Sequence, residues 1–154
     1  MKQECGRSMI EMLGVLTIMG IITVGATLLI SRAMDLQRRN TINDEVVQIV
    51  TNVRTMHAEY DDFSNINSQI ILGAMGQKNL NTYGVSYEIT TDAANSRQFI
   101  VTVKNLSESD CKFLLAKAWR DSVGFRLSDG KEGGATGKCD QGTGKNFIRI
   151  TYGE

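Results

Sequence analysis

The chain has 154 residues, of which 42% are hydrophobic and 22% charged, with 17 basic and 17 acidic side chains. This length fits one modest domain, and the balanced charge lacks the basic excess that favours nucleic acid or an anionic membrane surface as the main partner. The sequence contains no proline, so no residue forces a helix to break.

The N-terminus carries the strongest signal in the chain. A polar segment, 1–6, precedes Arg7-Ser8-Met9-Ile10-Glu11, and residues 12–30 are all uncharged. As a helix, residues 12–30 span about 28 Å, just enough to cross the hydrocarbon core of a membrane. Glu11 then lies near membrane depth, where an acidic group costs roughly 2.5–3.5 kcal/mol unless it has a cationic partner. A cut after Gly6 supplies one, because the new α-amino group, with an ordinary pKa of about 7.7–8.0, lies four residues before Glu11.

Gly6 followed by Arg7-Ser8-Met9-Ile10-Glu11 and an apolar helix resembles a type IV prepilin. The resemblance implies that a dedicated prepilin peptidase cuts after Gly6 and N-methylates Arg7. It also implies that Glu11 neutralises the terminal amine of a neighbouring subunit during fibre assembly. Arg7 stands where the family mostly has Met, Phe or Leu. Further segments resemble the type IVb branch, the class of the toxin-coregulated pilins: Ile18-Met19-Gly20, Gly25, Arg32-Ala33-Met34-Asp35-Leu36-Gln37 and Leu106-Ser107-Glu108-Ser109-Asp110-Cys111-Lys112.

Two other interpretations of the N-terminus stay open. The first is a cleaved secretory signal, for which Ser31-Arg32-Ala33 offers a small-x-small site. The second is a plain signal anchor on an unrelated protein. The apolar run is longer than the usual signal core of 7–15 residues, and an acidic residue at its head fits a signal poorly.

Apolar residues recur at helical spacing beyond the membrane-length segment and predict one continuous helix of roughly 80 Å that ends near Tyr60. Its first half, 7–30, is apolar all round and its second half, 31–60, is amphipathic, so the first half needs lipid or copies of itself. Gly14, Gly20 and Gly25 interrupt the apolar half. The resemblance implies close packing and local unwinding near Gly20 in an assembled fibre, and ordinary tolerance of glycine in membrane helices is the alternative. The stripe consists of Val46, Ile49, Val50, Val53, Met56, His57 and Tyr60.

Residues 61–154 predict a small α+β head. Residues 61–83 form a polar connection with a short helix at Ile70-Ile71-Leu72, and alternating residues 85–89 and 99–103 predict a β-hairpin. Ser107 and Asp110 fit a capping box that begins a helix reaching about Asp121, with Cys111, Leu114, Leu115 and Ala118 on its buried face and Trp119 as core filler. Residues 124–144 are rich in glycine and predict a loop, and residues 146–152 predict a terminal strand.

Three cysteines become two if the chain is cut after Gly6, because Cys5 leaves with the leader. In an exported protein the remaining pair, Cys111 and Cys139, predicts a disulfide that bounds 111–139, and free thiols are the alternative. The resemblance points the same way, because Leu106–Lys112 resembles the segment with the first cysteine of the type IVb disulfide. Loop closure of this size contributes about 3.5 kcal/mol in the chain-entropy model.

The sequence predicts no catalytic residue, cofactor or metal site. Gly137-Lys138 and Gly144-Lys145 lack the flanking residues of a phosphate-binding loop, and the single histidine, His57, lies on the helix stripe, where a packed or subunit-facing role is expected. Asp61-Asp62 lies at a helix end, where solvated carboxylates are ordinary, and Asn105-Leu106-Ser107 matches a glycosylation sequon whose serine the helix cap already explains.

These features together predict a type IV pilin fold, an α+β chain in which a long N-terminal helix packs against a small antiparallel sheet. The resemblance implies a structural subunit that is held in the inner membrane as a precursor. The pilus assembly machinery then extracts it into a helical homopolymer on the cell surface. Its adhesion, motility, aggregation or uptake role is not indicated. A minor pilin, a secretion-system pseudopilin, a pilin-anchored ligand-binding or DNA-binding module, and an exported enzyme are the alternatives, in that order.

Overall fold

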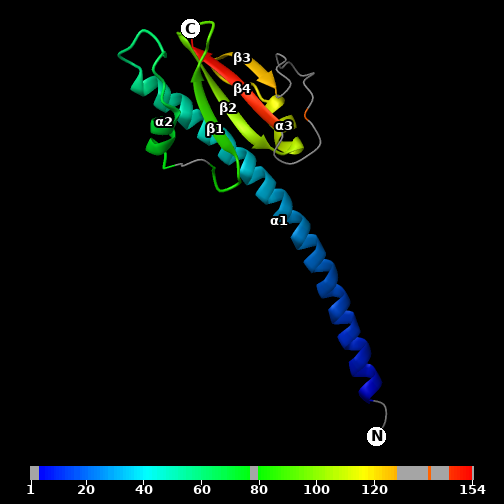
Figure 1. Ribbon diagram of the computed structural model, residues 1–154. Helices are drawn as coiled ribbons and strands as arrows, with labels where there is room; N and C mark the ends of the chain where they lie inside the picture. Colours follow the sequence, from blue (N-terminus) through cyan, green and yellow to red (C-terminus); the bar gives the residue numbers. More distant parts are fainter. Residues whose placement is uncertain (1–3, 77–79, 128–138, 140–145, 154) are drawn as a thin grey trace. The chain divides into compact units, whose positions relative to one another are not determined.

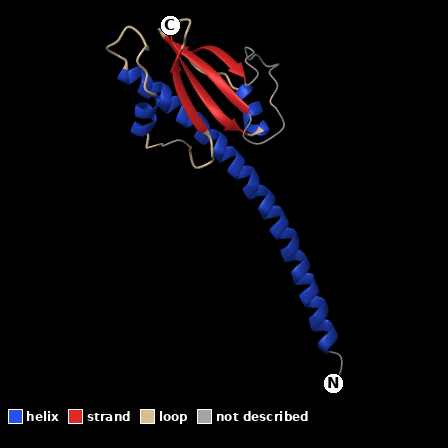
Figure 2. Cartoon of the chain, viewed as in Figure 1, coloured by secondary structure: helices blue, strands red, loops and turns tan. Residues whose placement is uncertain are grey.

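The computed structural model describes residues 4–76, 80–127, 139 and 146–153, and of residues 4–8, 126 and 127 it describes the backbone alone. Helices and strands follow the order α1, α2, β1, β2, α3, β3, β4 (Figures 1 and 2). The chain divides into two compact units, Met1–Arg38 and Arg39–Glu154, and helix α1 contributes residues to both. We call the second unit, 39–154, the head unit.

Helix α1 spans Glu4–Met56 without interruption, as the absence of proline predicts. The predicted end at Tyr60 is wrong by one turn, because residues 57–59 form a turn. Val53 is the last fully buried residue on the helix, whereas Met56 and Tyr60 are 42% and 68% exposed. A final turn without buried contacts lacks the tertiary packing that supplies most helix stability in proteins.

The head unit contains one antiparallel sheet of four strands in the order β1-β2-β4-β3. The expected hairpin is β1 (Ser86–Thr91) with β2 (Gln98–Leu106), and the expected terminal strand is β4 (Asn146–Gly153), which lies between β2 and β3. Strand β3 (Ser122–Leu127) corrects the sequence prediction, which placed 124–127 in a loop. Val123, Phe125 and Leu127 alternate as strand residues do, but the high glycine content of residues 124–144 led to the prediction of a loop.

The core of the head unit lies between the C-terminal part of α1 and one face of the sheet, which confirms the predicted α+β class (Figure 1). Ile42, Val46, Ile49 and Val53 recur every three or four residues on α1 and are fully buried. Alternate strand residues face them, because side chains two apart lie on one face of a strand. These are Tyr87 and Ile89 on β1, Phe99, Val101 and Val103 on β2, and Ile148, Ile150 and Tyr152 on β4.

Helix α2 (Ser68–Ala74) is the short helix expected in the connection after α1. The Asn67 side chain caps it by accepting hydrogen bonds from the backbone of Gln69 and Ile70 at 3.0 and 3.3 Å. Ile71 and Leu72 are buried while Ile70 is 61% exposed, so only part of the apolar cluster reaches the core.

Helix α3 (Glu108–Leu115) begins where the sequence predicts and ends earlier than Asp121. The Ser107 hydroxyl accepts a hydrogen bond from the Asp110 backbone at 3.2 Å, as the capping motif requires. Cys111 and Leu114 are fully buried, but Ala118 is exposed, which corrects its assignment to the buried face. The half-buried Trp119 donates from Nε1 to the Leu114 carbonyl at 3.2 Å, so it satisfies a terminal carbonyl that a longer helix would have used.

A polar cluster ties α1 to the loop before β1. Glu45 Oε2 accepts hydrogen bonds from the Tyr87 hydroxyl at 2.5 Å and from Asn81 Nδ2 at 2.7 Å. Asn81 Oδ1 in turn accepts from the backbone of Tyr83 and Val85 at 2.9 and 3.0 Å. Burial, together with the hydrogen bond and charge of Glu45, raises the pKa of Tyr87 well above its ordinary value, so the phenol stays a donor.

A second polar cluster ties α3 to α1. Asp110 is buried, accepts the Ser107 hydroxyl at 2.6 Å and lies 3.5 Å from Arg39 Nε. The Arg39 guanidinium also stacks 5.2 Å from the centre of the Phe113 ring. The contacts of Arg39 with Asp110 and with Phe113 therefore join α1 to α3.

A matched pair of valines tests the packing of α1 on the sheet. Val46 is fully buried and the adjacent Val47 is 53% exposed. We expect Val46→Ala to lower the free energy of unfolding of the head unit by about 2 kcal/mol, from lost apolar burial and the cavity left behind. Val47→Ala should stay within about 0.5 kcal/mol of the unsubstituted chain. Urea titration in detergent measures both values, and equal losses would contradict the assigned orientation of α1.

The buried tyrosines predict a loss of stability at alkaline pH. Burial raises the pKa of both Tyr87 and Tyr152 above 10.0, so the folded state retains protons that the unfolded state releases. Their contribution is complete below about pH 10, and above it stability falls by about 1.4 kcal/mol per pH unit for each tyrosine. Tyr87→Phe should remove roughly half of this dependence, and Tyr152→Phe the other half. Chemical denaturation between pH 9 and 11 provides the measurement.

Candidate functional site

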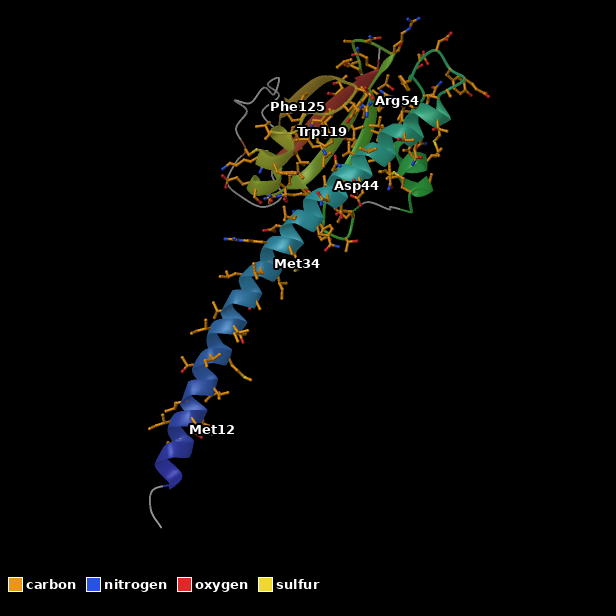
Figure 3. The ribbon with its side chains drawn as sticks, turned by 180° about the vertical axis from the view of Figure 1, so that it is seen from behind. Met12, Met34, Asp44, Arg54, Trp119 and Phe125 are labelled. Carbon is orange, nitrogen blue, oxygen red and sulfur yellow. A yellow bond between two sulfur atoms is a disulfide. The ribbon has the colours of Figure 1, made fainter. Side chains whose placement is uncertain are left out.

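The N-terminal part of α1 presents an uncovered apolar surface. Every residue from Met9 to Gln37 is exposed, so apolar side chains project from all sides of the helix. Figure 3 labels Met12 and Met34 on this part of α1. Among the described residues, α1 is the one helix that is long and apolar enough to cross a membrane by length and composition. The large apolar side chains are Met9, Ile10, Met12, Leu13, Val15, Leu16, Ile18, Met19, Ile21, Ile22, Val24, Leu28, Leu29, Ile30, Met34 and Leu36.

The hydroxyl groups on this surface are satisfied within the helix. Each donates to the backbone carbonyl four residues earlier, a bond that removes a polar donor from the surroundings. The segment therefore meets its surroundings as an apolar surface, which is the requirement for a helix in lipid or in a bundle of apolar helices. The four bonds are Thr17 to Leu13 at 2.8 Å, Thr23 to Met19 at 2.8 Å, Thr27 to Thr23 at 2.8 Å and Ser31 to Thr27 at 3.0 Å.

Glu11 stands at the N-terminal end of the apolar surface, and its residue is exposed. No ion pair joins it to another side chain in the part of the chain that the structure describes. Gly6 and Arg7 lie in the preceding turn of the same helix, and Arg7 is four residues before Glu11, a spacing that places both on one helix face. The side chain of Arg7 lies outside the described residues, as does everything before Glu4.

Gly14, Gly20 and Gly25 have open space around them. A Cβ added at any of the three meets nothing within 4 Å, and α1 continues through Gly20 as a regular helix. Nothing in the part of the chain that the structure describes therefore requires glycine at these positions. A requirement would have to come from a second helix packed closely against them, so the packing hypothesis and ordinary glycine tolerance both stay open.

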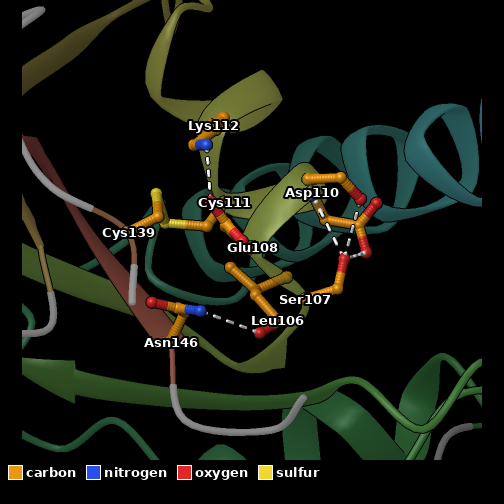
Figure 4. Close-up of a disulfide and its surroundings, with 9 residues drawn as sticks. Leu106, Ser107, Glu108, Asp110, Cys111, Lys112, Cys139 and Asn146 are labelled. Atoms are coloured by element: carbon orange, nitrogen blue, oxygen red, sulfur yellow. Dashed lines mark hydrogen bonds and ion pairs between the residues drawn. A yellow bond between two sulfur atoms is a disulfide. The ribbon is translucent and has the colours of Figure 1, made fainter. Parts of the chain in front are cut away.

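Cys111 and Cys139 form a disulfide, as the sequence predicts (Figure 4). Their Cα atoms are 6.0 Å apart, and Cys111 is fully buried on α3 while Cys139 packs half-buried against the core. Next to the bridge, Asn146 is buried and donates from Nδ2 to the Leu106 carbonyl at 3.3 Å (Figure 4). The bridge thus connects the first turn of α3 to the chain just before β4.

His57 takes part in the packing of the head unit. Its ring is half-buried, lies 5.6 Å from the Phe63 ring and places Nδ1 3.1 Å from the Val53 carbonyl. No group of three or more metal-ligating side chains occurs within the described residues. The glycine-lysine pairs at 137–138 and 144–145 lie outside them, and the expectation that the chain lacks catalytic residues stays a prediction.

A cavity at the end of the head unit was missed by the sequence reasoning. It is lined by residues from the end of α1, the connection after it, the β1–β2 turn and the end of β4. Asp61 was singled out only as half of a solvated pair. No local pattern marks this site, because Arg97 and Gly153 are far from residues 54–63 in the sequence and come together only when β4 pairs with β2.

No protein-family model matches this chain, and no curated protein sequence matches it. The chemistry of the site therefore rests on the residues described above.

Removal of the disulfide tests its contribution to the head unit. We expect the double variant Cys111→Ser, Cys139→Ser to lose about 3.5 kcal/mol of unfolding free energy, because the unfolded chain regains the entropy of the closed loop. The control is Cys5→Ser, which removes a thiol outside the bridge and should leave stability unchanged. Urea titration of all three proteins in detergent gives the values, and an unchanged midpoint in the double variant would contradict a structural bridge.

Proposed function

We propose that this chain is a structural subunit of a type IV pilus, which polymerises after a prepilin peptidase cuts it behind Gly6 and methylates Arg7. The observation that carries the proposal is the exposed apolar surface of α1 from Met9 to Leu36, which has no covering element within the described residues. Such a surface is stable only in lipid or against other apolar helices. A precursor in the inner membrane that later packs into a homopolymer meets both conditions.

The head fold supports the same proposal. The α+β head packed on the C-terminal part of the same helix, with a disulfide between Cys111 and Cys139, matches what the resemblance to type IVb pilins implies. The disulfide also fits an exported protein, since such bonds persist in oxidising compartments. In a fibre, the N-terminal segments would exchange lipid for one another while the heads face outward on the cell surface.

In this proposal, Glu11 sets the position of each subunit relative to its neighbour in the fibre. A carboxylate at the head of an apolar segment is costly unless a cation reaches it, and the terminal amine of a neighbouring subunit provides one. Only a subunit placed to deliver its amine to Glu11 avoids an unpaired charge in the fibre core. Membrane insertion does not need this pair, because removing the carboxylate makes the helix more apolar.

Replacement of Glu11 tests the proposal directly. We expect Glu11→Ala to insert into the membrane normally and to yield no sheared fibres, because subunits lose the pairing that fixes their register. The matched control is Glu59→Ala, an exposed carboxylate beyond the end of α1, which should give normal fibres. Membrane fractionation, shearing and electron microscopy give the readouts. Abundant fibres from Glu11→Ala would contradict the assigned role.

A minor pilin or a secretion-system pseudopilin is the second candidate, because these share the N-terminal segment and the helix-plus-sheet architecture. Abundance separates the two. A major subunit should dominate the sheared fraction as a band near the 17.0 kDa of the whole chain less its leader, whereas a minor subunit should appear there only in traces.

A further inference from the structure

The cavity in the head unit has a volume of 560 Å³ and an unusual combination of side chains. Two of them are arginines, two are aromatic and one is a carboxylate. Volumes of roughly 300–1,000 Å³ are typical of sites that bind small molecules. The lining residues are Arg54, Tyr60, Asp61, Phe63, Arg97 and Gly153, and Figure 3 labels Arg54 among them.

The backbone around the cavity is held in place by close contacts. Gly153 has φ of +138°, and a Cβ added there would lie 2.3 Å from the Arg97 carbonyl oxygen, so only glycine fits. Gly153 pairs with Gln98 across the β2–β4 ladder. The Phe63 backbone donates to the Ser96 carbonyl at 2.7 Å. These contacts fix the backbone beside Arg97 and Phe63, which is the preorganisation that a binding site requires.

The two guanidinium groups keep donors available for a ligand. Arg54 Nη1 lies 3.7 Å from Asp121 Oδ2, a loose pair that leaves most of the five N–H donors of Arg54 without a partner among the described residues. Arg97 is exposed, and no carboxylate forms an ion pair with it within the described residues. An anionic group in the cavity would therefore meet two planar forks, the geometry that binds carboxylates through paired hydrogen bonds.

We propose that this cavity binds a sugar acid, a hydroxylated ring that carries one carboxylate, such as a sialic or uronic acid. The carboxylate pairs with Arg97 and Arg54, while the faces of Tyr60 and Phe63 cover the apolar side of the ring. Asp61 accepts hydrogen bonds from ring hydroxyls. The same Asp61 disfavours a phosphate dianion, which has more negative charge and fewer hydroxyl donors to offer. The inference does not depend on fibre assembly, because every lining residue belongs to the head unit.

Titration of the full-length chain in detergent micelles tests the proposal. The probes are N-acetylneuraminic acid and glucuronic acid, with glucose as a ring without a carboxylate and acetate as a carboxylate without a ring. We expect the backbone amide resonances of Arg97 and Gly153 to shift in a saturable manner with either sugar acid, and at least tenfold more weakly with glucose or acetate. Loss of binding at high ionic strength should follow, since the contact is between charges.

Variants separate the proposed contacts from general charge effects. Arg97→Ala should weaken sugar-acid binding by roughly tenfold or more, because a hydrogen bond to a charged group is lost. Arg97→Lys should restore only part of it, since an ammonium lacks the planar fork. The control Arg149→Ala removes an exposed arginine on β4 that stacks over Phe147, outside the cavity, and should bind normally.

Four results would overturn the proposal. The first is the absence of any shift at Arg97 and Gly153 with both sugar acids. The second is equal binding of acetate, which would mean that the ring makes no contact. The third is binding that Arg97→Ala leaves intact, with circular dichroism showing that the variant is folded. Saturable shifts from a short polyglutamate peptide but not from sugar acids would also contradict it, and would point to an acidic peptide as the occupant.

Discussion

The apolar side chains in the N-terminal half of α1 must be covered for the helix to be stable. From Met9 to Leu36 the helix exposes large apolar side chains on every side, and its hydroxyls are bonded back to its own carbonyls. The charged side chains on this surface are Glu11 near its start and Arg32 and Asp35 beyond Ile30. Water is a poor solvent for such a helix, so lipid or other apolar helices must surround it.

The C-terminal part of the same helix is built for the opposite purpose. Ile42, Val46, Ile49 and Val53 complete the core beneath the sheet, and two polar clusters, around Glu45 and Arg39, add directional contacts that apolar packing alone does not give. Without α1, the buried apolar residues on β1, β2 and β4 would be exposed to water. One continuous helix therefore carries both the exposed apolar surface, which needs lipid or other apolar helices around it, and the buried residues that complete the core of the head unit.

The sequence predicted those elements whose signal is local and periodic. The uninterrupted helix, the hairpin, the Ser107 cap and the terminal strand follow from apolar spacing and capping chemistry within short windows. Strand β3 was missed because the many glycines of residues 124–144 predict a loop for the whole segment. The ends of α1 and α3 depend on which residues find tertiary contacts. Pairing of Cys111 with Cys139 followed from counting, whereas the cavity between Arg54 and Arg97 needed the β2–β4 register, which no local window contains.

Intact mass spectrometry of the protein recovered from the cell surface decides whether the chain is cut after Gly6 and polymerised, as we propose. We expect loss of Met1 to Gly6, one added methyl group on Arg7 and two hydrogens missing from the Cys111–Cys139 pair, in material that sediments as a polymer. A soluble monomer outside the cell that still carries its first six residues would contradict the claim, because Glu11 would then have no new terminal amine to neutralise and the apolar helix no copies to cover it.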